Sequence, residues 1–174
     1  METTGRTINV QNFLNENKFS GYQWMIFIIC LLIAFFDGMD TAAIGYVAPS
    51  LLEEWGIEKS QLAPVLSAAL FGLAIGAMTS GPIADKFGRK IVLTASVLVF
   101  SGFCVASAFA QDLTQMTILR FITGLGLGAA MPNAVAMLSE YCPDHKRSLI
   151  LNTMYCGFPV GAAAGGFFAS FIIP

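Results

Sequence analysis

The chain has 174 residues, of which 56% are hydrophobic and only 11% are charged. Soluble domains carry about 25% charged residues, so this composition argues strongly against a soluble enzyme. The net charge of −2 provides no basic field for nucleic acid, whereas the length accommodates about five membrane helices of ~20 residues with their loops.

Charge-poor runs divide the sequence into five predicted membrane-spanning helices. We place these helices at about 24–48, 61–84, 91–110, 114–138 and 149–172. Each run reaches the roughly 20 residues that cross a hydrocarbon layer of ~30 Å. The polar residues 1–23 precede the first span and contain no signal-peptide cleavage pattern. The predicted fold is therefore an all-α membrane protein.

The distribution of Lys and Arg predicts the orientation of these spans. Alternating the spans places residues 1–23, 85–90 and 140–147 on one side of the membrane, and these segments hold seven of the nine basic residues. The opposite loops hold only Lys59. Because cytoplasmic loops are enriched in Lys and Arg, we expect residues 1–23 to be a cytoplasmic segment.

The four cysteines form no CxxC pair, and the chain contains a single histidine, which argues against a zinc site. Cys30, Cys104 and Cys156 lie in apolar runs, where a free cysteine acts as a small hydrophobic residue. We find no nucleophile–base pair, phosphate-binding loop or metal-ligand set at membrane depth. The sequence therefore predicts neither an enzyme nor a bound metal or organic cofactor.

Three ionisable residues lie well inside the predicted spans: Asp37, Asp40 and Arg120. An ionised side chain at this depth costs at least a few kcal/mol, so each of the three is a functional candidate. The aspartates are three residues apart and share a helix face. The rise of ~1.5 Å per residue places Arg120 at a similar depth. We expect an ion pair, or a shared cavity that holds an anion.

Two interpretations of this cluster are open. In the first, Arg120 and one aspartate form a fixed bridge that only holds helices together. In the second, the aspartates carry a proton, because one arginine does not fully neutralise two close carboxylates in a poor dielectric and the pair titrates as a unit. A proton-coupled carrier requires such a group inside the membrane.

Small residues recur at intervals of four in three spans. The rows are Ala68, Gly72, Gly76 and Ser80; Gly124 and Gly128; and Gly157, Gly161, Gly165 and Ala169. This spacing predicts close approach of helix backbones. The rows serve either static packing or helices that rock against one another, and Pro132 and Pro159 are expected to bend their spans.

The loop between the second and third spans reads GPIADKFGRK, from Gly81 to Lys90. It resembles the G-x-x-x-D-(R/K)-x-G-R-(R/K) motif of the major facilitator superfamily, which occupies this position on the cytoplasmic side. The matching residues are Gly81, Asp85, Lys86, Gly88, Arg89 and Lys90. A basic loop that only fixes topology would explain the positive charges but not their spacing.

Two further stretches are similar to the same superfamily. Arg120, followed by a run of glycines, resembles its fourth-helix motif. Glu140 and Arg147 resemble two residues of its loop after helix four, which join a charge network with the arginine of the first loop. The resemblance implies a cytoplasmic gating latch that favours the outward-open state and consists of Asp85, Arg89, Glu140 and Arg147.

The first span narrows the resemblance. Residues Asp37 to Asp40 match the D-G-x-D motif of the aromatic acid:proton symporters, and the flanking sequence is similar to bacterial carriers of 4-hydroxybenzoate and protocatechuate. The resemblance implies symport of an aromatic carboxylate with a proton across the bacterial inner membrane, driven by the proton gradient. It also implies that Arg120 attracts the substrate anion and that the aspartate pair carries the proton.

Members of this superfamily have twelve spans in two six-helix halves. The five predicted spans correspond to most of the first half, so we expect residues 24–174 to be a partial N-terminal bundle of a longer transporter. The expected partners are the C-terminal half, the lipid bilayer, protons and a small aromatic carboxylate, and no nucleic acid. One alternative is a sugar or other organic-anion porter of the same superfamily, which needs no D-G-x-D motif. Another is a non-transporting membrane scaffold or sensor subunit with five spans.

Overall fold

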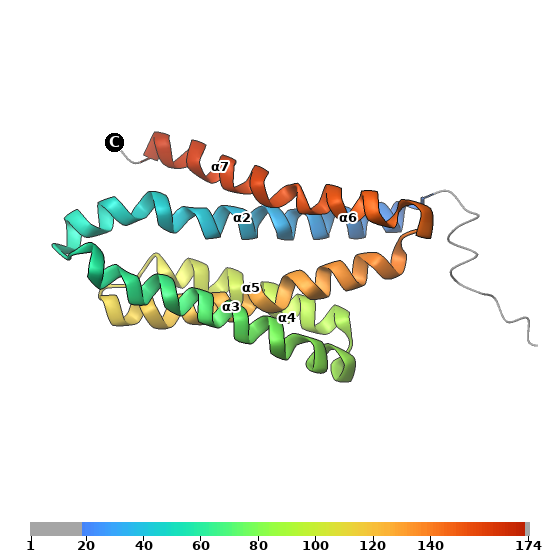
Figure 1. The fold of residues 1–174 in the computed structure, drawn as a ribbon, viewed down its shortest axis with the longest axis horizontal. Helices are drawn as coiled ribbons and strands as arrows, with labels where there is room; N and C mark the ends of the chain where they lie inside the picture. Colours follow the sequence, from blue (N-terminus) through green and yellow to red (C-terminus); the bar gives the residue numbers. More distant parts are fainter. Residues whose placement is uncertain (1–18, 173–174) are drawn as a thin grey trace, which may run out of the picture.

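The structure, a computed structural model, describes residues 19–172, apart from the side chains of Glu54 and Ile172. Every regular element in this range is helical (Figure 1). The elements are α2 (Gly21–Trp55), α3 (Lys59–Phe87), α4 (Arg89–Ser107), α5 (Leu113–Tyr141), the short 3₁₀ turn η1 (Asp144–Lys146), α6 (Arg147–Tyr155) and α7 (Gly157–Ile172). Most of the predicted cytoplasmic segment, residues 1–23, lies outside the described residues.

Five helical stretches in the described range are long and apolar enough to cross a membrane. They are Gly21–Glu53, Lys59–Phe87, Arg89–Ser107, Leu113–Tyr141 and Asp144–Phe171. These helices confirm the predicted all-α membrane fold with about five spans. Large apolar side chains remain on the outer faces, including Phe71 and Met78, which are 67% and 80% exposed. A helix that is apolar on its outer face as well suits a lipid surrounding.

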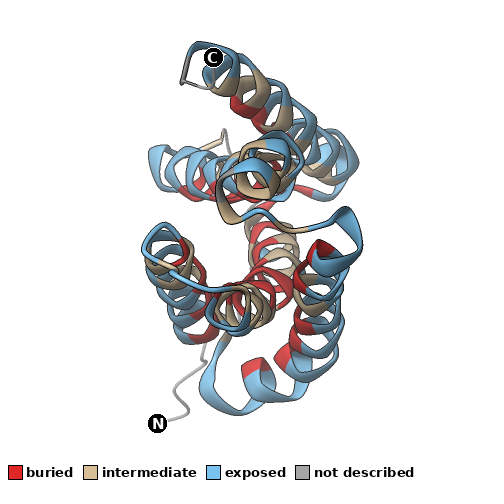
Figure 2. Ribbon diagram, turned by 90° about the vertical axis from the view of Figure 1, so that its left-hand side faces the viewer, coloured by how far each residue is buried: buried red, intermediate tan, exposed pale blue. Residues whose placement is uncertain are grey.

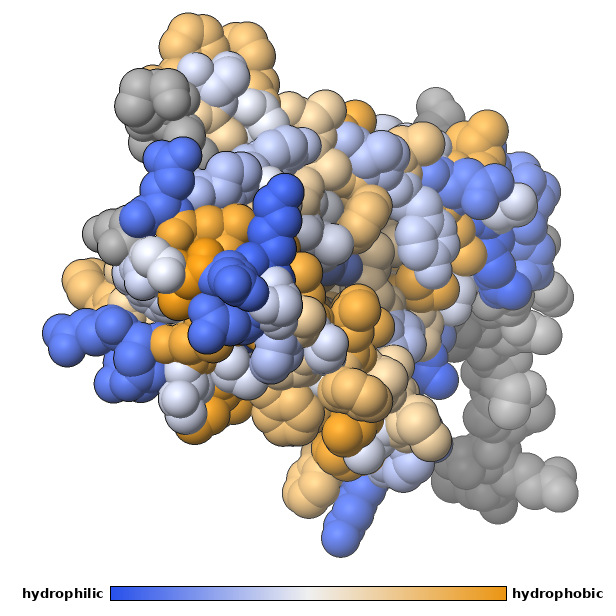
Figure 3. Space-filling model, turned by 60° about the vertical axis from the view of Figure 1, so that its left-hand side comes forward, coloured by the Kyte–Doolittle hydropathy of each residue, from blue (hydrophilic) through white to orange (hydrophobic). Residues whose placement is uncertain are grey.

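The surface of the molecule has the same character. In the face shown in Figure 3, apolar side chains cover much of the surface between the helix ends, and the most hydrophilic side chains gather toward the ends. This distribution matches a bundle whose middle lies in hydrocarbon and whose ends meet water.

The longest helix, α2, extends beyond its predicted end. It begins after Ser20, whose hydroxyl accepts a hydrogen bond from the backbone of the first turn. The helix continues through Pro49 to Trp55 and ends at Gly56, which has a φ of 61° that favours glycine. Its last turns pack against buried residues of α3 and α5, namely Leu62, Val65 and Met116. This packing explains why the helix persists beyond residue 48.

The fifth span is two helices rather than one. α6 ends at Tyr155 and α7 begins at Gly157, with Cys156 between them. Pro159 lacks the N–H that a continuous helix would donate to the carbonyl of Tyr155, so the regular pattern is interrupted at this point. The sequence predicts a bend at this proline, and the structure has a break there, beyond which α7 slopes away from the direction of α6 (Figure 1).

The helices form two layers (Figure 1). α2 lies beside α6 and α7 in one layer, and α3, α4 and α5 make up the other. Buried residues line the sides on which the helices face one another, as the red segments of Figure 2 show. The main buried cluster joins both layers and includes Ile26 and Ile33 of α2, Leu93 of α4, Ala134 of α5 and Met154 of α6.

Glycines bring α3 and α5 into backbone contact. Gly72 of α3 lies against the carbonyl of Phe121 on α5, and Gly124 of α5 lies against the carbonyl of Ala69 on α3. One turn further along, Gly76 and Gly128 repeat this reciprocal contact with Leu125 and Leu73. A Cβ at any of these glycines would overlap the facing carbonyl oxygen. The predicted close approach is therefore present, and it pairs the second and fourth spans.

The same relation joins α2 and α7 in the other layer. Gly38 of α2 lies against the carbonyl of Phe158, and Gly161 of α7 lies against the carbonyl of Phe35. A side chain at either glycine would again overlap backbone. Both layers are therefore held by reciprocal glycine–carbonyl contacts, which place the charged residues of α2 and α5 at fixed positions.

Candidate functional site

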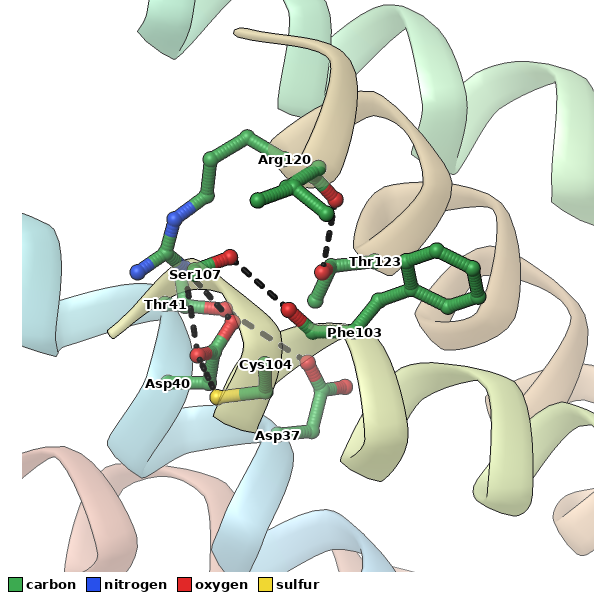
Figure 4. A network of polar contacts seen from close by, with 9 residues as sticks. Asp37, Asp40, Thr41, Phe103, Cys104, Ser107, Arg120 and Thr123 are labelled. Carbon is green, nitrogen blue, oxygen red and sulfur yellow. Dashed lines mark hydrogen bonds and ion pairs between the residues drawn. The ribbon is translucent and has the colours of Figure 1, made fainter. Parts of the chain in front are cut away.

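The intramembrane charges lie together where α2, α4 and α5 meet (Figure 4). Arg120 of α5 donates from Nη1 to both carboxylate oxygens of Asp40 on α2, at 3.1 Å to Oδ1 and 3.2 Å to Oδ2. The Arg120 and Asp40 side chains are 11% and 9% exposed. The pair joins the two layers, since Asp40 belongs to α2 and Arg120 to α5. Loss of either partner would leave the other as a poorly solvated, unpaired charge.

Asp37 has a different environment from Asp40, although the two share α2. Its residue is 6% exposed, and its Oδ1 accepts a hydrogen bond from the Thr41 hydroxyl at 3.4 Å. Within residues 19–172, Asp37 forms no ion pair. The structure therefore brings Arg120 to one aspartate and leaves the other with a single weak, uncharged donor.

A thiol completes the surroundings of Asp40. Cys104 of α4 donates from Sγ to Asp40 Oδ1 at 2.9 Å, so residues of three helices meet at this carboxylate (Figure 4). Sequence reasoning treats Cys104 as a small apolar residue because it lies in an apolar run. Nothing in the sequence indicates its partner, since the contact depends on how α4 packs against α2.

Arg120 retains hydrogen-bonding capacity. Asp40 engages only its Nη1, and its Nε is buried with no hydrogen-bond partner among the described residues. A guanidinium presents five N–H donors in a planar fork that matches a carboxylate. Nη1 is therefore engaged by Asp40, while the buried Nε has no partner in the described part of the chain.

A cavity of about 310 Å³ adjoins this pair. Its polar lining comes from Asp40, Thr41, Arg120 and Thr123. Its apolar lining comes from α2, α3 and α5 and includes Ile44, Leu66, Leu70, Leu73 and Leu127. One charged fork beside apolar walls is the usual make-up of a site for a small amphipathic ligand.

Among the described residues, an ion pair joins the loop motif to the end of α5. Arg89, the first residue of α4, contacts Glu140 in the last turn of α5 through Nη1 and Oε1 at 3.2 Å. Their side chains are 38% and 53% exposed, so the pair contributes about 0–1 kcal/mol. Gly88 links α3 to α4 with a φ of 90°, a backbone conformation that few other residues adopt.

The other predicted latch residues are arranged differently. Arg147 pairs with Asp144, one turn earlier in the chain, at 2.9 Å. Asp85 is exposed and forms no ion pair within residues 19–172. The structure therefore unites only Arg89 and Glu140 of the four residues that the sequence groups together.

The remaining motif residues lie on the surface of the described bundle. Lys86 lies over the ring of Phe87, with Nζ 5.5 Å from the ring centre, and Lys90 is exposed. Gly81 is exposed on α3, and a Cβ there would meet no described atom within 4 Å. A cavity of about 920 Å³ opens beside this loop, and Arg120 is not among its lining residues. Apolar residues of α2, α4 and α5 line it together with the charged residues Asp85, Arg89, Lys90 and Glu140.

Comparison with known proteins identifies the family. The sequence profile of the Major Facilitator Superfamily matches residues 30–174. The chain belongs to the major facilitator superfamily. It is 53% identical over 172 residues to the 4-hydroxybenzoate transporter PcaK of Pseudomonas putida. The matched region covers 99% of this chain and 38% of that protein.

More distant similarities extend to other transporters of this superfamily. The chain is 45% identical over 167 residues to a gallate transporter of Pseudomonas putida, covering 96% of this chain and 37% of that protein. It is 35% identical over 174 residues to the benzoate transport protein of Acinetobacter baylyi, covering 97% of this chain and 37% of that protein. The chain thus spans less than two fifths of the length of these relatives. It is a multi-pass membrane protein of a transporter family.

Proposed function

We propose that this chain forms the N-terminal part of a bacterial inner-membrane symporter that imports an aromatic carboxylate, such as 4-hydroxybenzoate or protocatechuate, with a proton. The Arg120–Asp40 pair beside the 310 Å³ cavity carries this proposal. The similarity to carriers of 4-hydroxybenzoate, gallate and benzoate supports the class of substrate. We call the protein that contains this chain and the remaining spans the complete transporter.

Arg120 is the proposed anchor for the substrate. The Nε side of its guanidinium donates hydrogen bonds to the substrate carboxylate, and Nη1 keeps its contact with Asp40. The apolar residues of the cavity, among them Leu66 and Leu127, take the aromatic ring. An anion with an apolar body fits this combination better than a sugar, which would leave hydroxyl groups without partners against apolar walls.

The aspartates are the proposed proton carriers. A substrate carboxylate beside Asp37 and Asp40 would bring three negative charges to one arginine in a poorly solvated region. Protonation of one aspartate removes one of these charges, so binding of the anion and binding of the proton favour each other. The proton gradient then drives accumulation, and no cofactor is required.

The Arg89–Glu140 pair is the contact that we propose as the cytoplasmic latch in this part of the chain. It joins the ends of α4 and α5 near the motif loop, with the N-terminus assigned to the cytoplasm from the distribution of Lys and Arg. Its low energetic value suits a contact that opens and closes during each transport cycle.

Uptake by the complete transporter in proteoliposomes tests this function. We expect accumulation of labelled 4-hydroxybenzoate or protocatechuate when the outside is acidic, and only equilibration when a protonophore removes the gradient. Uptake of benzoate and gallate measures the specificity among aromatic acids. Glucose and succinate are the controls, because they represent the substrates of a sugar porter and of another organic-anion porter. Accumulation of either control, without that of any aromatic acid, would contradict the proposal.

A further inference from the structure

We propose that Cys104 is a positioning residue that holds the Asp40 carboxylate in place while Arg120 divides its guanidinium between Asp40 and the substrate. This inference rests on the transport function proposed above. It gives α4 a role in the site, in addition to the roles of α2 and α5, which carry the charged residues.

The geometry places the thiol and the guanidinium on the same oxygen. Asp40 Oδ1 lies 2.9 Å from Cys104 Sγ and 3.1 Å from Arg120 Nη1. The two donors come from α4 and α5, while the carboxylate belongs to α2. The carboxylate is therefore held from two sides, and only one of these contacts involves the residue proposed to bind substrate.

Cys104 acts through Asp40 and not on the ligand. It is not among the residues that line the 310 Å³ cavity, whereas Asp40 and Arg120 both are. Substitution of Cys104 therefore leaves the walls of the cavity unchanged. Its effect on transport has to come through the placement of the carboxylate.

The chemical reason is competition for Arg120. When a substrate carboxylate binds the guanidinium, the interaction between Arg120 and Asp40 weakens, because one guanidinium then pairs with two carboxylates. A thiol is a weak donor, but a charged acceptor strengthens its hydrogen bond. Cys104 thus keeps the Asp40 carboxylate in position to receive a proton during the exchange.

Uptake kinetics of matched variants test this role in the complete transporter. Cys104→Ala removes the donor, and we expect the maximal rate of gradient-driven uptake to fall about tenfold, as for loss of one hydrogen bond to a charged group, with little change in KM. Cys104→Ser restores a donor and should remain within about twofold of wild type. Cys156→Ala, at the exposed junction of α6 and α7, is the control and should behave as wild type. Equal activity of Cys104→Ala and Cys104→Ser, whether high or low, would overturn the positioning role.

Infrared spectroscopy of the purified transporter gives a second readout that does not depend on transport. The S–H stretching band of Cys104 is assigned by its loss in Cys104→Ser. We expect it below the frequency of a free thiol and expect it to rise in Asp40→Asn, whose neutral amide is a weaker acceptor. A band that does not respond to Asp40→Asn would overturn this inference alone. A wild-type protein that carries no aromatic acid would overturn the proposed function and this inference together.

Discussion

At the scale of single residues, the two aspartates of α2 differ in the side chains that contact them, although they lie three residues apart on the same helix. Asp40 is hydrogen-bonded to Arg120 and Cys104, whereas the partner of Asp37 among the described residues is the Thr41 hydroxyl. Loss of charge at Asp40 therefore leaves Arg120 buried without its partner, which is a severe penalty. Loss of charge at Asp37 leaves no cation unpaired, so the two positions should respond differently to the same substitution.

The first prediction concerns these two positions. Asp37→Asn and Asp40→Asn should each abolish gradient-driven accumulation, because asparagine is nearly isosteric with aspartate but does not ionise. Asp37→Asn should retain substrate exchange, since exchange need not release the proton and the Arg120 pair is intact. Asp40→Asn should also lose thermal stability. Uptake and counterflow in proteoliposomes measure both activities, and normal accumulation by both variants would leave the fixed bridge as the better account.

The second prediction concerns Arg120. Arg120→Ala should weaken binding of the aromatic acid about 100-fold, because two charge-assisted hydrogen bonds are lost. Arg120→Lys should recover little of this loss, since a lysine provides a point charge and not a planar fork. Equilibrium binding of the labelled acid at several pH values is the measurement. In the wild type, binding should strengthen as the pH falls, because protonation of the aspartate pair removes a competing negative charge. Lys59→Ala, exposed at the start of α3, is the control and should bind as wild type.

The main elements of this site follow from the sequence, and the finer ones do not. The depth of these residues within the spans predicts that Arg120 and the aspartates approach each other, because an unpaired charge inside the membrane is energetically costly. The choice of Asp40 over Asp37 and the contribution of Cys104 depend on the rotation of α2 and α4. These rotations are set by packing, which no single span encodes.

At the scale of helices, the glycine rows allow the backbones of α3 and α5, and of α2 and α7, to lie in contact. The spacing of four predicts close approach, but it does not predict that α3 pairs with α5 and α2 with α7. The interruption between α6 and α7 is similar: Pro159 predicts a disturbance, while its extent depends on the packing around it. The continuation of α2 to Trp55 likewise reflects contacts with α3 and α5 that lie far along the chain.

The third prediction tests the glycine contacts. Gly161→Ala should lower the stability of the protein by about 1–3 kcal/mol, because its Cβ would overlap the carbonyl of Phe35 and force α2 and α7 apart. Gly102→Ala, on an open face of α4, should be neutral or slightly stabilising, since alanine is the better helix former. Thermal unfolding in detergent compares the two variants. An equal loss of stability in both would show that the close contact is unimportant.

At the scale of the whole molecule, the described bundle has its charged pairs at different depths. Arg120–Asp40 lies inside the membrane span, while Arg89–Glu140 lies at the end that carries the motif loop. The number of membrane spans in the described range and the placement of both charged groups follow from the charge pattern of the sequence. The pairing of Arg147 with Asp144 does not, because a neighbour one turn away competes successfully with the more distant partners that the motif implies.

The fourth prediction tests the Arg89–Glu140 pair in the complete transporter. Arg89→Ala should slow transport several-fold and shift the population toward inward-open states, as expected when a weak contact of at most about 1 kcal/mol is lost. Charge reversal at both positions, Arg89→Glu with Glu140→Arg, should restore part of the rate. Transport rate and cysteine accessibility from each side are the measurements.

Reversal of the local pair, Asp144→Arg with Arg147→Asp, provides the control and should have a smaller effect on the distribution of states. A double reversal at Arg89 and Glu140 that is no better than either single change would exclude direct coupling between them.

The reciprocal glycine contacts relate the intramembrane ion pair to the packing of both layers. In each layer, a glycine faces a carbonyl of its partner helix, and the returning contact lies three residues away on both helices: Gly38 with Gly161 in one layer, and Gly124 with Gly72 in the other. In each layer one of the two interlocked helices, α2 or α5, also carries a residue of the Arg120–Asp40 pair. Each member of the pair is therefore anchored through its own helix to a second helix, with no side chain between the backbones. A movement of one layer against the other would carry α7 along with Asp40 and α3 along with Arg120.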